Sequence, residues 1–184
     1  MPAYPSKKDR PALRRAGRLA AFWGWSYILT LVALYGVSAT PPGPLRVLVL
    51  NTSLLFAAIG VAELYWRRRL LVTGQARWVR ILALNEVAGT LVLLWNIYLV
   101  DRISPALLTS LITPDTRHAL NQLGEAMHTP VTEAMIENSF RVAKSLTMYG
   151  VGGILLLSQV WIIYRYLSLA PAIEREANIP PVLQ

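Results

Sequence analysis

AELYWRRRLLVTGQARWVRILALNE, residues 62–86, is the stretch of sequence that decides the fold. It joins the end of one apolar run to the start of the next through a block of arginines and Gly74. Guanidinium groups are costly to move across a lipid bilayer, so we expect this segment to stay on the side of the membrane where the chain is made. The apolar runs that flank it must then leave that face and return to it. The arginines concerned are Arg67, Arg68, Arg69, Arg77 and Arg80.

Four apolar runs with almost no charge fall at residues 19–38, 45–64, 81–100 and 146–164. Each is about 20 residues long, which as a helix rising ~1.5 Å per residue covers a hydrocarbon core of about 30 Å. The backbone must hydrogen-bond to itself inside lipid, and the runs lack the alternation of barrel strands. The sequence therefore predicts an all-α, polytopic membrane protein with four transmembrane helices.

The basic residues indicate how these helices are oriented. Thirteen of the 18 Lys and Arg residues fall in the arm at residues 1–18, in the loop after the second run, or beyond the fourth run. Because basic loops stay inside, we expect both termini to be cytoplasmic in a multi-pass protein of the bacterial inner membrane. The net charge of +8 then reflects topology and contact with lipid headgroups, and it does not predict a nucleic-acid partner.

A secretory signal is the alternative for the N-terminal region, because Val37-Ser38-Ala39 resembles a cleavage site after a basic and an apolar segment. The apolar run is longer than a usual signal core, however. It also carries four aromatic residues suited to anchoring at a membrane interface. These are Phe22, Trp23, Trp25 and Tyr27.

Residues 101–141 are too long for a plain connection, and we expect a helical extracytoplasmic loop between the third and fourth spans. Three Ser-Pro or Thr-Pro pairs predict helix starts there. The middle helix, residues 115–127, is amphipathic, and the last is expected to run unbroken through Phe140 into the fourth span. Residues 170–184 form a short, proline-rich and pliable cytoplasmic tail. The three pairs are Ser104-Pro105, Thr113-Pro114 and Thr129-Pro130.

Small residues at helical spacing predict close packing between helix backbones. The first run carries Gly17, Ala21 and Gly24 on one side, and the second run has a similar series. A group of glycines near the start of the fourth run indicates a close helix contact or a kink. The second series is Ser53, Ala57 and Gly60, and the glycine group is Gly150, Gly152 and Gly153.

Polar residues within the spans must face protein or water. Asn85, Gly89 and Asn96 lie close to one stripe of the third span, with Glu86 beside it. Gln159 lies at a depth similar to that of Asn85 and Glu86 on the fourth span. We therefore predict hydrogen bonds among these side chains inside the bundle.

Glu63 and Glu86 are the acidic residues at the inner ends of the second and third spans. An ionisable side chain in a span is a candidate for ion or proton handling. The simpler interpretation is anchoring, in which Glu63 pairs with Arg67 one turn away and Glu86 pairs with Arg80 or Arg18. We favour the anchoring ion pairs.

Sequence motifs for catalysis, cofactors and resident metals are absent. The chain has no cysteine, and it contains no nucleophile elbow, Walker loop, HExxH or dinucleotide-binding glycine pattern. His118 and His128 flank the amphipathic loop helix, with Asp115 and Glu125 in range, but their spacing fits no usual metal motif. We expect no enzymatic activity, no cofactor and no metal site.

These observations predict a small, non-catalytic scaffold or accessory subunit within the lipid bilayer. Its partners would be other copies of the chain or other membrane-protein subunits. The alternative is a channel or transporter with a polar path near Asn85, Glu86, Asn96 and Gln159.

Overall fold

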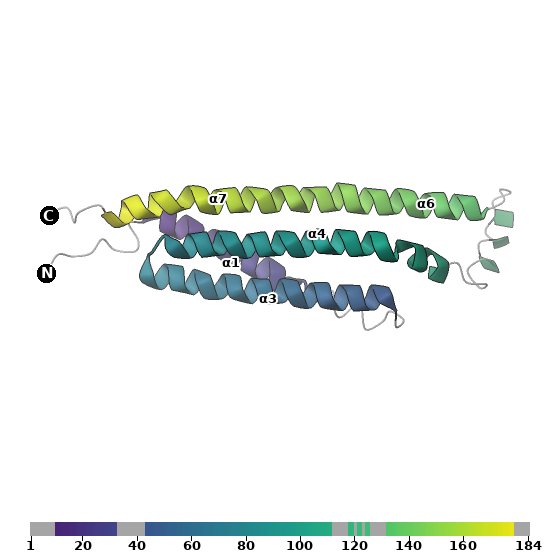
Figure 1. Ribbon diagram of the computed structural model, residues 1–184, viewed down its shortest axis with the longest axis horizontal. Coiled ribbons are helices and arrows are strands. Elements are labelled where there is room, and N and C mark those ends of the chain that lie inside the picture. Colours follow the sequence, from purple (N-terminus) through teal and green to yellow (C-terminus); the bar gives the residue numbers. More distant parts are fainter. Residues whose placement is uncertain are drawn as a thin grey trace.

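The computed structural model describes residues 10–32, 43–111, 118–119, 121–122, 124–125 and 132–178. Within this part of the chain the regular structure is helical and contains no strand, which confirms the all-α prediction. The helices form an elongated bundle, and the last three named below follow one another end to end along it (Figure 1). The named helices are α1 (Pro11–Leu29), α3 (Pro44–Thr73), α4 (Arg77–Leu111), α6 (Glu133–Ser145), the π-helical η2 (Leu146–Val151) and α7 (Gly152–Asn178).

Three of the described helices are long and apolar enough to cross a membrane. They comprise 28 residues at Arg46–Thr73, 29 at Arg77–Pro105 and 45 at Ala134–Asn178. The helices that include these stretches contain the predicted second, third and fourth spans. The described part of α1 is not among these helices, because three arginines fall in the first half of its 19 residues and leave too short an uncharged stretch. Residues 33–38, which complete the predicted first span, lie outside the described residues.

The third span is longer than predicted. Ser104-Pro105 does not start a new helix, because α4 continues through it to Leu111. The Ser104 hydroxyl donates to the carbonyl of Asp101 at 2.9 Å within the same helix, so it does not cap a following one. A proline disturbs the backbone bonds of a single turn, which a long helix can absorb. The predicted outer loop therefore begins later than residue 101.

The fourth span also extends beyond its predicted limits. The helix that contains it is capped by Thr132, whose hydroxyl accepts a hydrogen bond from the backbone amide of Met135 at 3.3 Å. The two predicted helix starts at Thr113-Pro114 and Thr129-Pro130 lie outside the described residues. From Glu133 the chain is helical through α6, η2 and α7, which confirms the unbroken run past Phe140. The predicted pliable tail is wrong for residues 170–178, because α7 continues through Pro171 to Asn178.

The junction of α6 and α7 is a single π-helical turn. It ends at Val151, and the next residue, Gly152, begins α7. Gly152 faces α4, because a Cβ at this position would lie 3.3 Å from the side chain of Ile97. A π turn inserts one extra residue and rotates the faces of the helix beyond it. The glycine group thus marks both a change in helix register and a close contact, and Gly153 has open space around its own Cβ position.

Gly74 closes the hairpin between α3 and α4. It adopts the left-handed conformation, with φ at 65°, and its amide donates to the Leu70 carbonyl at 2.8 Å. Glycine tolerates this conformation without a steric penalty, which explains the sharp helix end. Beside the turn the rings of Trp66 and Trp78 stack with their centroids 5.4 Å apart.

The predicted close approach of small residues is confirmed between α1 and α3. A Cβ added at Gly60 would lie 2.6 Å from the carbonyl oxygen of Gly24, and one at Gly24 would lie 3.2 Å from the carbonyl of Gly60. Ala57 and Ser53, one and two turns earlier on α3, are buried in the same stripe. The two backbones therefore touch where both helices carry glycine.

The apolar core lies at the end of the bundle where α1 begins and α7 ends, and residues of α1, α3, α4 and α7 all contribute to it. Glu176 links these two helices directly. Its carboxylate accepts from the backbone amides of Ala12 at 2.7 Å and Leu13 at 3.4 Å. A carboxylate at this place satisfies amides that have no partner within the first helical turn and complements the helix dipole.

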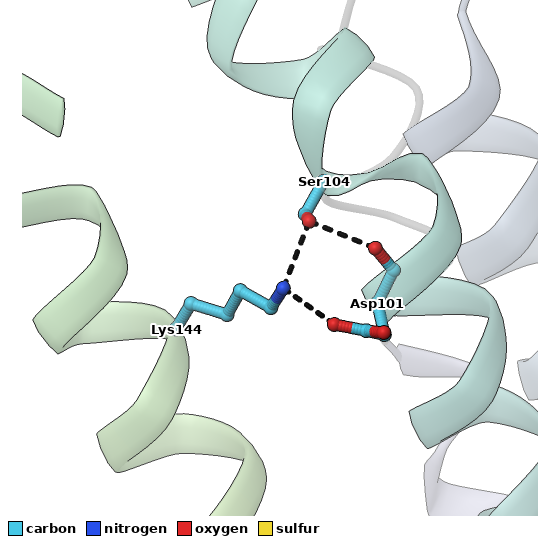
Figure 2. Close-up of polar contacts among 3 residues, drawn as sticks. All are labelled: Asp101, Ser104 and Lys144. Atoms are coloured by element: carbon cyan, nitrogen blue, oxygen red, sulfur yellow. Dashed lines mark hydrogen bonds and ion pairs between the residues drawn. The ribbon is translucent and has the colours of Figure 1, made fainter.

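Toward the opposite end of the bundle, hydrogen bonds from Lys144 join α6 to α4. Figure 2 shows Lys144 of α6 reaching toward α4. Its ammonium group donates to Asp101 at 2.6 Å and to the Ser104 hydroxyl at 2.9 Å. Ser104 therefore contributes to the contact between helices in place of the predicted helix start.

Candidate functional site

The first of two buried polar clusters is centred on Glu63 of α3. The carboxyl is 0% exposed. It accepts hydrogen bonds from the hydroxyl of Tyr166 on α7 and from the side-chain amide of Asn85 on α4, the latter at 2.7 Å. Asn85 also donates to the Ile59 carbonyl at 3.1 Å. Three helices thus meet around one carboxyl group.

The second cluster is centred on Glu86 of α4, also 0% exposed. The hydroxyl of Tyr27 on α1 donates to its Oε2 at 2.5 Å. The Gln159 amide on α7 fits in two orientations. In one, its nitrogen lies 2.5 Å from the Tyr27 hydroxyl, and in the flipped one the nitrogen donates to Glu86 Oε2 at 2.9 Å. In the flipped orientation the Tyr27 hydroxyl donates to the Gln159 oxygen in place of Glu86, because a hydroxyl has a single proton, and both ends of the amide then have a complementary partner.

The two clusters repeat the same chemistry. In each, a glutamate from a central helix is bonded by a tyrosine from α1 or α7 and by a carboxamide from a neighbouring helix. The clusters are neighbours on α4, because Asn85, which bonds Glu63, directly precedes Glu86. Gly89 lies one turn beyond Asn85, and a Cβ there would be 3.4 Å from the Tyr27 hydroxyl, so the absence of a side chain leaves room for this cluster.

The predicted anchoring ion pairs are replaced by other contacts. Arg67 donates through Nε to the Gly17 carbonyl of α1 at 2.8 Å, and Arg80 pairs with Glu174 of α7 at 2.7 Å. Among the ion pairs of the described residues, none involves Glu63 or Glu86. The reason is helical geometry: both carboxyls lie on the face that points into the bundle, whereas the neighbouring arginines reach to its surface.

Asn96 lies apart from both clusters. Its oxygen hydrogen-bonds the hydroxyl of Thr52 on α3, and its nitrogen donates to the Val92 carbonyl at 2.7 Å. With Asn51 it lines a groove of about 620 Å³ between α3 and α4, whose other walls are mainly apolar. Asn96 is ten residues from Glu86, about 15 Å along a helix. The predicted polar stripe is therefore divided between a buried cluster and a surface groove.

The tyrosines are the part of the site that the sequence analysis missed. Tyr27 is interpreted there as an interfacial anchor, yet it is only 5% exposed and points into the bundle. A signal for both exists: Tyr27 continues the buried face of Gly17, Ala20 and Gly24. Tyr166 lies one further seven-residue step beyond Gly152 and Gln159.

The described residues show no group of three or more His, Asp or Glu side chains able to hold a metal ion. His118 lies 3.3 Å from the amide nitrogen of Gln122, four residues on. His128 lies outside the described residues.

The fold and the buried clusters define the class: a helical membrane protein with a polar interior that joins its helices. Comparison with protein families, with curated proteins and with solved structures finds no match to the chain.

Proposed function

We propose that the protein is a non-catalytic scaffold or accessory subunit, which packs through the groove between α3 and α4 against a transmembrane helix of a partner. The partner is a second copy of the chain or a subunit of a larger membrane complex. In this arrangement both termini lie in the cytoplasm of a bacterial cell, and α1 crosses the inner membrane together with the three longer helices.

The groove between α3 and α4 is the observation that carries this proposal. Asn51 is exposed in it, and its side chain has no hydrogen-bond partner among the described residues. An amide facing hydrocarbon without a partner is unfavourable, and an interhelical hydrogen bond relieves that cost. A neighbouring helix with a polar side chain would satisfy Asn51 and cover the apolar walls formed by Leu55, Trp95 and Leu99.

The buried clusters support the same role. Their side chains bond to one another and are closed off by packed helices, and neither Glu63 nor Glu86 lines the α3–α4 groove. Such contacts hold four helices in a fixed arrangement, as a docking platform requires.

Photo-crosslinking tests the proposed interface. A benzophenone amino acid at Leu55, in the groove, is expected to form a protein adduct in native membranes. The same probe at Leu157, which is 72% exposed on α7, should form none. Asn51→Leu should reduce the adduct at position 55. A monomeric protein in mild detergent, with no protein adduct at position 55, would refute the proposal.

A proton or cation pathway is the second candidate. It is favoured by one observation: two carboxyls are buried in neighbouring clusters, and Glu86 Oε1 has no hydrogen-bond partner among the described residues. Buried ionisable groups of this kind serve proton relays in transport proteins. The proposed path does not include Asn96, because this side chain lies outside both buried clusters.

Ion flux in proteoliposomes tests this candidate. A pathway through the cluster predicts proton or cation flux that Glu86→Gln abolishes and that the surface change Glu174→Gln leaves intact. Equal flux in the wild type and in Glu86→Gln would remove the cluster from any transport mechanism.

A further inference from the structure

A second groove, of about 660 Å³, lies between α1 and α3 near the end of the bundle where α1 begins. Its walls combine three arginines with apolar side chains and include no acidic residue. The arginines are Arg14 of α1 and Arg67 and Arg68 of α3, and the apolar walls are formed by Leu13, Trp25, Leu64, Leu71 and Val72.

The three arginines of the groove lie at the level expected for lipid headgroups. Between Arg46 and Arg67, α3 is about 30 Å long at ~1.5 Å per residue, which matches the thickness of a hydrocarbon core. Arg67 and Arg68 therefore fall at the boundary between hydrocarbon and headgroups. Arg14 lies further toward the same end, because α1 runs antiparallel to α3, with Gly24 beside Gly60 and Gly17 beside Leu71.

Within the described part of the chain, no acidic side chain neutralises the positive charge in this groove. No ion pair of the described residues involves the three arginines. Arg67 is held in position by the bond from its Nε to the Gly17 carbonyl at 2.8 Å, which leaves its two terminal nitrogens to bind a ligand. By contrast, the neighbouring Arg69 is occupied with the hydroxyl and ring of Tyr65.

The apolar side of the groove continues in the opposite direction, toward the middle of the membrane. Trp25 is eleven residues after Arg14, about 16 Å along α1, and it is 58% exposed beside Leu64. A ligand that fits this arrangement has a compact anionic head and a long apolar tail. We infer that the groove between α1 and α3 binds one anionic glycerophospholipid, its phosphate on Arg14, Arg67 and Arg68 and an acyl chain along Leu64 and Trp25.

Binding is measured with dioleoyl phosphatidylglycerol whose chains are brominated across their double bonds, added to the full-length protein in detergent micelles. A brominated acyl chain quenches tryptophan fluorescence on contact, and the part of the quenching lost in Trp25→Phe reports the groove. Dioleoyl phosphatidylcholine serves as the zwitterionic control, and inorganic phosphate tests whether a free anion competes.

The decisive comparison uses two double variants with the same loss of charge. Arg14→Gln/Arg68→Gln removes two groove arginines and keeps Arg67, whose bond to α1 supports the fold. Arg15→Gln/Arg69→Gln removes neighbours that do not line the groove. Contact between an arginine and an anionic headgroup is worth about fivefold in affinity, so the groove variant should bind phosphatidylglycerol more than about tenfold more weakly. The control variant should stay within about twofold.

Three results would overturn the assignment. The first is equal binding of phosphatidylglycerol by the two double variants. The second is binding of phosphatidylcholine as tight as that of phosphatidylglycerol. The third is full displacement by millimolar inorganic phosphate, which would indicate a site for a free anion.

Discussion

Glu63 and Glu86 show how single side chains connect this bundle. Each carboxyl would be costly to bury alone, and each is bonded by side chains from other helices: Tyr166 and Asn85 around Glu63, Tyr27 and Gln159 around Glu86. The bonds are directional, so they fix the rotation of each helix as well as its neighbours. Apolar packing specifies rotation less strictly inside lipid, where the surroundings are equally apolar.

Tyr166→Phe is expected to destabilise the protein by about 1–2 kcal/mol, because it removes a donor from a buried carboxyl while it preserves the ring. Unfolding by sodium dodecyl sulfate in mixed micelles measures the change. Tyr164→Phe is the matched control, since Tyr164 is 66% exposed on the same helix, and it should stay within about 0.5 kcal/mol of the wild type. Equal stability of the two variants would show that the Glu63 bond contributes nothing.

The pairing of α1 with α3 depends on the absence of side chains at two positions. Gly24 and Gly60 bring the helix backbones together, and the neighbouring residues Tyr27 and Glu63 are thereby placed inside the bundle. The glycines therefore act on the buried clusters indirectly, by setting the distance between helices.

Gly60→Ala is expected to cost about 1–3 kcal/mol, because the new Cβ would meet the Gly24 backbone at 2.6 Å. Gly153→Ala is the control: it lies in α7, with nothing within 4 Å of its Cβ position. The higher helix propensity of alanine should leave it neutral or slightly more stable. Thermal unfolding in detergent distinguishes them, and a Gly60→Ala variant as stable as the wild type would contradict the close approach.

The arrangement of the complete bundle brings the start of α1 and the end of α7 to one end (Figure 1), where Glu176 binds the first amides of α1. The packed core lies at this end of the bundle. Toward the other end, Lys144 joins α6 to α4 through its bonds to Asp101 and Ser104. A four-helix arrangement of this kind places both chain ends on one side of a membrane if α1 crosses it.

Reporter fusions test that arrangement. A fluorescent protein that folds only in the cytoplasm and a phosphatase active only outside it are joined in turn ahead of Pro11 and after Asn178. Both junctions are expected to give fluorescence and no phosphatase activity, because basic residues concentrate near them. Opposite signals at the two junctions would require α1 to remain on one side of the membrane.

The sequence alone determined the helical class, the three long apolar helices and the turn at Gly74, because these depend on local properties: hydrophobic length, glycine conformation and arginine placement. It also indicated that Asn85, Glu86 and Gln159 face the protein interior. It did not determine the limits of the helices. Pro105 and Pro171 read as boundaries, but the long helices accommodate both.

Only the tertiary structure decided which side chains meet. Glu63 was expected to bond to Arg67, four residues away, and instead its partners come from α4 and α7, 22 and 103 residues along the chain. Likewise, the carboxylate of Glu176 near the end of α7 caps the first turn of α1 by accepting from Ala12, which is 164 residues away in the sequence. Helical periodicity predicts the face on which a residue lies, but the partner depends on the rotation and distance of neighbouring helices. Those are fixed by the packing of all four helices together, through contacts such as that of Gly24 with Gly60.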